Sequence, residues 1–234
     1  MISKASVIWV GLFCLIWSGP VPVAAEVKTS IAYEYYDVTP GPDGSLADSI
    51  FSSTPIFHSE GKFAGQSKYT IRYNYSYSRP TIGICRVTTV EVTCHCPITL
   101  PRLKGGNAVI KRNFENYLLR LDEHERRHCD IAIEHANLIE ARLKAVKSAK
   151  CGELAAEFKA RYDRIYEECR SAQARYDHET RHGLYEGADI AKFDARYKRD
   201  LEPGPASSGV GLKNLDKPDD SAFYQDADGV WRNY

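Results

Sequence analysis

Polar and apolar residues alternate strictly near the first third of the chain, where every second residue from Tyr69 to Tyr77 is aromatic or aliphatic. A period of two is typical of a β-strand with one buried face. Shorter alternations at 90–94 and 31–35 predict two more strands. We interpret the tyrosine row as a packed sheet face, which is commoner than a sugar-binding platform.

The period lengthens to three and four residues after Gly105 and Gly106. Apolar positions from Phe114 to Val146 predict a long helix over about 107–148, with Asn107 as its N-cap. Cys151 and Gly152 interrupt this pattern, and a second helix should run from about 153 into the high 170s. Because the break is short, we expect the two helices to pack as an antiparallel hairpin.

Both ends of the chain differ from its middle. Residues 1–25 combine Lys4, an apolar run over 5–17 and small residues up to Ala25, which predicts a secretory signal peptide. The run is too short for a membrane span and prolines follow it. Residues 191–234, rich in Pro, Gly, Ser and Asp, should form a polar, flexible tail. The segments 26–106 and 107–190 are then the β-rich and helical parts of one domain.

Removing residues 1–25 changes the composition in two informative ways. The 31 basic and 31 acidic residues of the full chain become 30 and 31 without Lys4, and this balance excludes a strongly basic nucleic-acid-binding surface. Loss of Cys14 leaves an even number of cysteines: Cys85, Cys94, Cys96, Cys129, Cys151 and Cys169. An even number in an exported chain predicts disulfides. A Cys151–Cys169 bridge could brace the helical hairpin, whereas metal binding by Cys94-His95-Cys96 is the less favoured interpretation.

The pattern H-E-x-x-H occurs twice, at 124–128 and 178–182. Histidines one helical turn apart can bind one zinc ion, and the glutamate between them can act as general base. Helical phase separates the two copies, because His124 and His128 fall on the apolar stripe while His178 falls on the opposite side. We therefore expect His124 and His128 to be metal ligands and Glu125 to be the catalytic base.

A catalytic zinc site needs a third protein ligand and one open position. Further residues on the same helix, such as His135, lie too far along it. The hairpin instead brings residues just beyond 176 opposite the motif, which leaves Asp177, His178 and His182 as candidates. His182 is the first choice, because imidazole is a common ligand and a glycine follows it. Asp177 is the second, either as a ligand or as the carboxylate that orients a histidine. Tyr176 and Tyr185 are candidate donors to an oxyanion.

This order of features resembles a bacterial family of predicted secreted zinc-dependent proteases, over roughly residues 30–190. The resemblance is carried by the tyrosine-rich β region, by His124-Glu125-x-x-His128, and by a second helix that ends in Tyr176-Asp177-x-x-Thr180-x-His182-Gly183. It implies a bacterial periplasmic or secreted setting, a zinc cofactor, and His182 rather than His178 as the recurring histidine.

Together these observations predict an α+β, zincin-like domain in which an antiparallel sheet packs against a metal-bearing helix and a second, antiparallel helix. The expected activity is zinc-dependent hydrolysis of peptide bonds in a peptide or protein substrate, with Glu125 as general base. Two alternatives remain open. One is a non-catalytic exported protein that binds metal, peptide or glycan, and the other is a zinc amidase that acts on cell-wall peptide.

Overall fold

The computed structural model describes residues 27–41, 45–59, 61–194, 223–225 and 231–233. The expected signal peptide at 1–25 lies outside these ranges. So does most of the expected tail, of which α4 (Ile190–Phe193) and a short antiparallel pair, β8 (Phe223–Gln225) and β9 (Trp231–Asn233), are described. No helix within the described ranges is long and apolar enough to cross a membrane.

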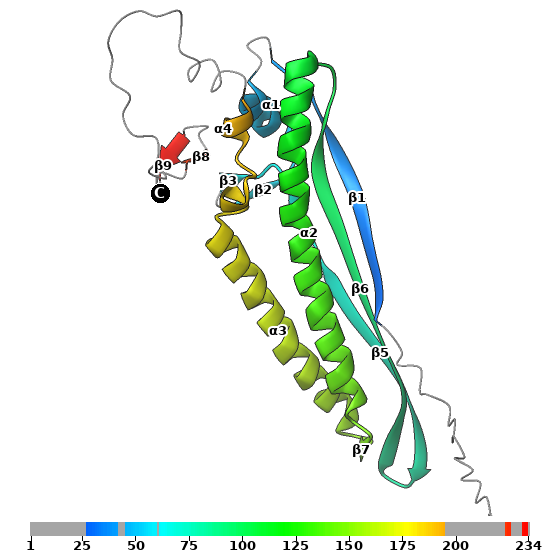
Figure 1. The fold of residues 1–234 in the computed structure, drawn as a ribbon. Coiled ribbons are helices and arrows are strands. Elements are labelled where there is room, and N and C mark those ends of the chain that lie inside the picture. The colour runs from blue at the N-terminus through cyan, green and yellow to red at the C-terminus, as the bar shows by residue number, and fades with distance from the viewer. Residues whose placement is uncertain (1–26, 42–44, 60, 195–222, 226–230, 234) are drawn as a thin grey trace, which may run out of the picture.

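One long strand, β6 (Ile84–Leu103), is the centre of the main sheet (Figure 1). On one side it pairs antiparallel with β5 (Thr70–Thr81) and β4 (Gln66–Ser67), and on the other with β1 (Lys28–Val38) and β7 (Ser148–Lys150). Every second residue of β6 from Val90 to Leu100 is buried. The alternation therefore places one face of the strand in the core, as the period of two predicts.

The expectation of a purely antiparallel sheet is wrong, because β1 runs parallel to β6. Between β1 and β5 the chain forms α1 (Leu46–Ser53) and the short strands β2 (Phe57–His58) and β3 (Gly61–Lys62). This connection lets β1 and β5 lie on opposite sides of β6. Alternation in sequence identifies the face that each side chain takes, but it contains no information on strand direction.

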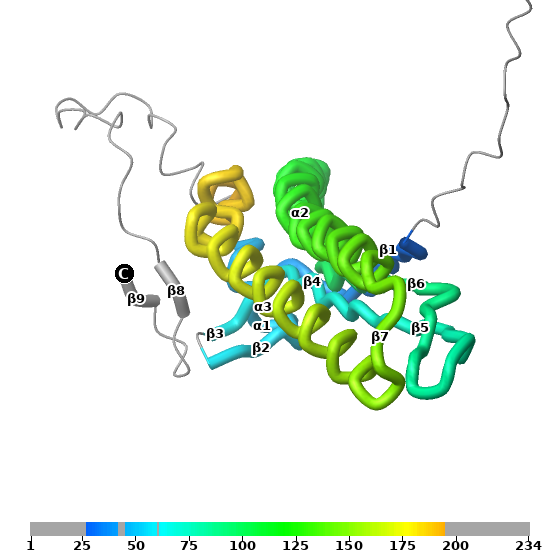
Figure 2. Tube along the Cα trace, turned by 90° about the horizontal axis from the view of Figure 1, so that it is seen from below, coloured from blue at the N-terminus to red at the C-terminus, as the bar shows by residue number. Residues whose placement is uncertain are grey.

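The two predicted helices are present as α2 (Ala108–Lys144) and α3 (Leu154–Thr180). The Asn107 side chain caps α2 by accepting a hydrogen bond from the Ile110 backbone N–H at 2.9 Å. Figure 1 shows α2 lying along the sheet, with α3 returning beside it from the end near β7, and Figure 2 shows the same layers end-on. The mixed α+β class is confirmed.

The tyrosine row of β5 is a packed face over most of its length. Tyr73 and Tyr75 lie against the ring of Phe158 on α3, at centroid distances of 6.2 and 4.2 Å. Tyr162 on α3 also donates its hydroxyl hydrogen to the Ile71 carbonyl oxygen at 2.7 Å. The row thus attaches α3 to the sheet, and only Tyr77, near the hairpin end, is largely exposed among its tyrosines.

Two disulfides fasten the helical hairpin to β6. Cys85 pairs with Cys151, and Cys96 pairs with Cys129 on α2. The suggested Cys151–Cys169 bridge is therefore wrong: Cys169 lies on α3, and a helix that rises about 1.5 Å per residue carries it far from Cys151. Cys94 and Cys169 remain as buried thiols.

The core divides into two clusters, and the H-E-x-x-H motif lies where they meet on α2. Leu121 belongs to the cluster that includes α1 and α4. Ile131 and Ala132 belong to the cluster between α3 and the β5–β6 hairpin. The segment between them is thus held in place from both directions.

Candidate metal site

The H-E-x-x-H motif of α2 faces inward, as helical phase predicted. His124, Glu125 and His128 are only 3%, 5% and 9% exposed. The disulfide from Cys129 to Cys96 on β6 follows directly after the second histidine. Polar groups buried to this degree need partners, so the site has to provide them from neighbouring elements.

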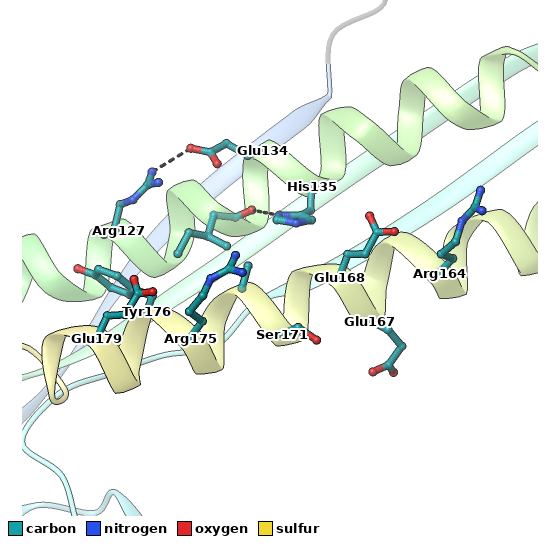
Figure 3. Close-up of a pocket in the computed structure, with 12 residues that line it drawn as sticks. Arg127, Glu134, His135, Arg164, Glu167, Glu168, Ser171, Arg175, Tyr176 and Glu179 are labelled. Atoms are coloured by element: carbon teal, nitrogen blue, oxygen red, sulfur yellow. Dashed lines mark hydrogen bonds and ion pairs between the residues drawn. The ribbon is translucent and has the colours of Figure 1, made fainter.

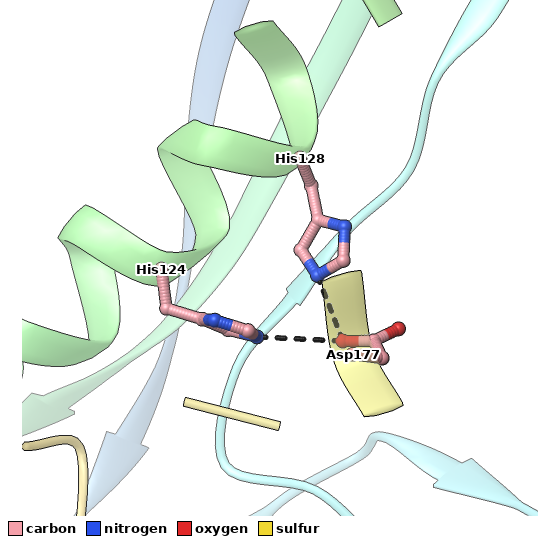
Figure 4. A group of neighbouring side chains, drawn as sticks. All are labelled: His124, His128 and Asp177. Atoms are coloured by element: carbon pink, nitrogen blue, oxygen red, sulfur yellow. Dashed lines mark hydrogen bonds and ion pairs between the residues drawn. The ribbon is translucent and has the colours of Figure 1, made fainter. Parts of the chain in front are cut away.

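Asp177 on α3 supplies the partner that the two histidines share (Figure 4). Its Oδ1 lies 2.9 Å from His128 Nε2 and 3.5 Å from His124 Nε2. Potential ligand atoms of these three residues all lie within 4.8 Å of one another, and no other such group of His, Cys, Asp or Glu occurs in the described part of the chain. Two imidazole nitrogens and one carboxylate oxygen are donors that zinc accepts.

The other nitrogen of each imidazole is bound from outside α2. His124 Nδ1 donates to Glu186 Oε2 at 2.8 Å, and His128 Nδ1 donates to Gln173 Oε1. Gln173 also donates from its amide to the His128 backbone carbonyl at 2.9 Å. Bonds of this kind fix the ring orientation and leave Nε2 as the nitrogen that faces a metal.

Tyr176 forms a wall of the site. Its ring stacks on His124 at 5.0 Å between centroids and meets His128 edge-on at 4.9 Å. Its hydroxyl lies 2.9 and 2.8 Å from the two carboxylate oxygens of Glu186, to which it donates. Burial and this carboxylate raise the pKa of Tyr176 well above its ordinary value, so the phenol keeps its proton.

Glu125 lies beside the group formed by His124, His128 and Asp177 without belonging to it. Burial raises its pKa, against the opposing effect of the two neighbouring imidazoles and a hydrogen bond with Ser67 of β4. Gly65, just before β4, makes room for this carboxylate, since a Cβ at that position would lie 2.9 Å from Glu125 Oε1. The carboxylate is therefore covered by the segment that leads into β4.

Asp177 is ionised in this environment. Burial acts to raise the pKa of Asp177, but hydrogen bonds from His124, His128 and His182 outweigh it and hold the pKa below its usual range. For His128, burial lowers the pKa, but Asp177, Gln173 and Glu125 together raise it above its usual value. The site thus concentrates one negative charge where a cation would bind.

A tight turn after α3 packs against His124 and completes the surroundings of the candidate metal site. Arg181, His182 and Gly183 all have positive φ, at 47°, 52° and 85°. A Cβ at residue 183 would lie 3.0 Å from His124 Cγ, so the close approach of the turn to α2 requires glycine. The 3₁₀ helix η1 (Leu184–Glu186) follows and carries Glu186 to His124.

Only some of the residues that the sequence analysis proposed for this site lie together in the structure. It brings together His124, Glu125, His128 and Asp177, and it places His182 beside Asp177, with Nδ1 at 3.4 Å from Oδ1 but outside the group of three. His178 is exposed. The side chains of Tyr176 and Tyr185 face other partners: Tyr176 bonds Glu186 and Tyr185 lies under the Arg181 guanidinium at 5.0 Å.

Sequence reasoning missed Gln173, Glu186 and Ser67. Gln173 lies one helical turn before Asp177 on α3, so the hairpin argument that selected Asp177 could have found it. Glu186 comes after the turn at 181–183. Arg181 and His182 are not residue types that indicate positive φ, so this turn was not predictable from the sequence. Ser67 lies on a two-residue strand, which is too short to give a periodic signal.

A groove of about 760 Å³ lies next to the site, between α2 and α3 (Figure 3). Tyr176 lines it and thereby separates it from the histidines. Its charged lining is three arginines and four glutamates: Arg127, Arg164, Arg175, Glu134, Glu167, Glu168 and Glu179. Because these charges nearly balance, the groove does not define a ligand of either sign.

Comparison with known proteins gives one match. A family described as "Bacterial protein of unknown function (DUF922)" matches residues 33–183, which include α2, α3 and every residue of the site except Glu186. No curated protein and no solved structure matches.

Proposed function

The chain belongs to this bacterial family of unknown function, and from the geometry of its site we propose that it is a zinc-dependent peptidase. The observation that carries the proposal is the group formed by His124, His128 and Asp177, whose ligand atoms lie within 4.8 Å of one another. Glu125 lies buried beside this group. That combination is the arrangement by which zinc hydrolases activate water.

The residues present fit zinc in three respects. The donors are nitrogen and oxygen atoms in the number that a catalytic site uses. Both histidines have their Nδ1 atoms bound elsewhere, by Glu186 and Gln173. Asp177 supplies a negative charge at low pKa. We propose Asp177 as third ligand ahead of His182, because the aspartate belongs to the group of three and the imidazole does not.

Zinc bound there would supply Lewis-acid chemistry, polarising a carbonyl group and making water more acidic. Glu125 would take a proton from the attacking water and deliver it to the leaving amine. Its burial under the segment before β4 limits exchange of that proton with solvent. The hydrogen bond with Ser67 fixes the orientation of the carboxylate.

A peptide fits this site better than a small ester does, because the site lies at a sheet edge. β4 carries Ser67 next to Glu125 and pairs with β6 on one side only among the described strands. An extended polypeptide can add to such an edge through backbone hydrogen bonds. An H-E-x-x-H helix behind the edge strand β4 is a zincin-like arrangement. With the expected signal peptide, the proposal extends to action outside the cytoplasm.

The proposal is tested with Glu125→Gln in the mature protein. The variant should keep stoichiometric zinc, because Glu125 is not one of the three proposed ligands, and it should lose hydrolysis of denatured casein by about two to four orders of magnitude. His178→Ala is the matched control, since His178 is exposed at the end of α3, and it should retain both zinc and activity.

Two results would contradict the proposal. Unaltered hydrolysis in Glu125→Gln would reject the role of Glu125, and zinc-free wild-type protein that also fails to take up added zinc would reject the site. Purified cell wall is assayed in parallel, so that cleavage there without cleavage of casein would identify the amidase instead.

A further inference from the structure

His182 has a backbone conformation that residues other than glycine rarely adopt. Its φ is 52°, between Arg181 at 47° and Gly183 at 85°. Such conformations are strained and persist where the surrounding structure imposes them, often at functional sites. Here the His182 backbone N–H donates to the Asp177 carbonyl oxygen at 2.9 Å, which closes the turn after α3.

The turn folds the His182 imidazole back over the site. Nδ1 lies 3.4 Å from Asp177 Oδ1, and the ring meets Phe63 edge-on at 5.1 Å between centroids. Its side chain is 42% exposed, compared with 3% for His124 and 11% for His128. The imidazole therefore lies on the solvent side of the carboxylate, where a substrate would enter.

Phe63 also connects this imidazole to the segment that covers Glu125. It belongs to the same segment as Gly65 and Ser67, which cover the Glu125 carboxylate. A peptide lying along β4 would thus pass close to both Glu125 and His182. A proton acceptor for water and a donor to the carbonyl that the water attacks both have to lie near the substrate.

The two tyrosines first considered for that donor role are engaged elsewhere. The Tyr176 hydroxyl donates to Glu186, and its ring is stacked on His124. Tyr185 is 62% exposed and lies under the Arg181 guanidinium. His182 contacts Asp177 through Nδ1 at 3.4 Å, so the carboxylate supports the imidazole from one side.

We propose that His182 is a catalytic residue that donates a hydrogen bond to the scissile carbonyl oxygen as that oxygen gains negative charge. The inference rests on the proposed peptidase function and assigns His182 to the substrate instead of the metal. The strained turn then has a purpose, because it directs the imidazole toward Asp177 while Gly183 and Glu186 contact His124.

His182→Gly is the decisive variant, because glycine adopts this φ without strain and the change should not weaken folding. We expect zinc affinity and melting temperature close to wild type, kcat lower by about 100-fold and KM nearly unchanged. A phosphinic peptide, whose phosphinyl oxygens imitate the charged carbonyl, should bind about 100-fold more weakly. His182→Asn, which retains an N–H donor and tolerates positive φ, should recover part of both losses.

The outcomes separate the possibilities. His178→Ala, the matched control, should change none of these values. A large loss of zinc affinity in His182→Gly would make His182 a ligand and overturn the proposal, and so would wild-type kcat in that variant. Wild-type protein that binds zinc but cleaves no peptide would overturn the peptidase function and this role with it, whereas cleavage that survives in His182→Gly overturns the role of His182 alone.

Discussion

Single residues decide which atoms of the site could hold a metal. His124 and His128 could be recognised from sequence, because their four-residue spacing and the apolar stripe around them require both to face inward. Asp177 and His182 could be selected as candidates, but the ranking that put His182 first rested on residue type and not on geometry. Their order depends on the turn at 181–183, whose φ values of 47° and 52° at arginine and histidine run against the intrinsic preference of those residues.

Gly183→Ala tests how closely that turn depends on contact with α2. The Cβ would add backbone strain at φ 85°, which alone costs about 1–2 kcal/mol. It would also lie 3.0 Å from His124 Cγ, so we expect the free energy of unfolding to fall by more than the strain alone. Displacement of His124 should lower zinc affinity about tenfold or more. Chelator competition and thermal unfolding measure the two effects.

Gly83→Ala is the matched control for this variant. Gly83 also has positive φ, at 77°, but no atom lies within 4 Å of the Cβ that it would acquire. It should lose stability through strain and keep wild-type zinc affinity. Equal zinc affinities in the two variants would contradict the contact with His124.

At the scale of elements, sequence periodicity predicted the two helices well and the sheet less well. The expected helix over 107–148 and its successor from about 153 correspond to α2 and α3, because amphipathic patterns of this length have few alternatives. The parallel direction of β1 and the strand β7 in the helix break were not predictable, since both depend on partners distant in sequence.

The Cys96–Cys129 disulfide ties the turn of α2 that carries His124 and His128 to β6. Replacing both cysteines by alanine should lower stability by about 3–4 kcal/mol, from the entropy of a loop of 33 residues. Because Cys129 follows His128 directly, zinc affinity should fall as well. Denaturant unfolding and chelator competition provide the two measurements.

The Cys85–Cys151 pair offers a comparison for that experiment. Its removal should cost a similar free energy, since its sequence separation is 66, but it joins β6 to the far end of the hairpin near β7. Zinc affinity should therefore remain at the wild-type level. A comparable loss of zinc affinity in both double variants would show that global loosening, and not the position of Cys129, is responsible.

At the scale of the whole molecule, the site joins parts that are otherwise held by separate core clusters. Its proposed ligands come from α2 and α3, and its supporting groups come from β4, η1 and the turn between α3 and η1. Zinc should therefore stabilise the fold, by about 2.7 kcal/mol when free zinc is a hundred times its dissociation constant. A chelator should lower the melting temperature of wild-type protein and have no effect on His128→Ala. An equal shift in both proteins would mean that zinc binds elsewhere.

The parallel pairing of β1 with β6 has a consequence for how the chain reaches this structure. Each residue of β1 pairs with a residue 65 positions later, from Lys28 with Thr93 to Val38 with Leu103. The first strand to be made thus has no partner until the chain has been synthesised to the far end of β6. High contact order of this kind slows folding. Because β1 can pair only after more than a third of the chain has been made, the unfolded N-terminal part could pass through a narrow channel before this sheet forms.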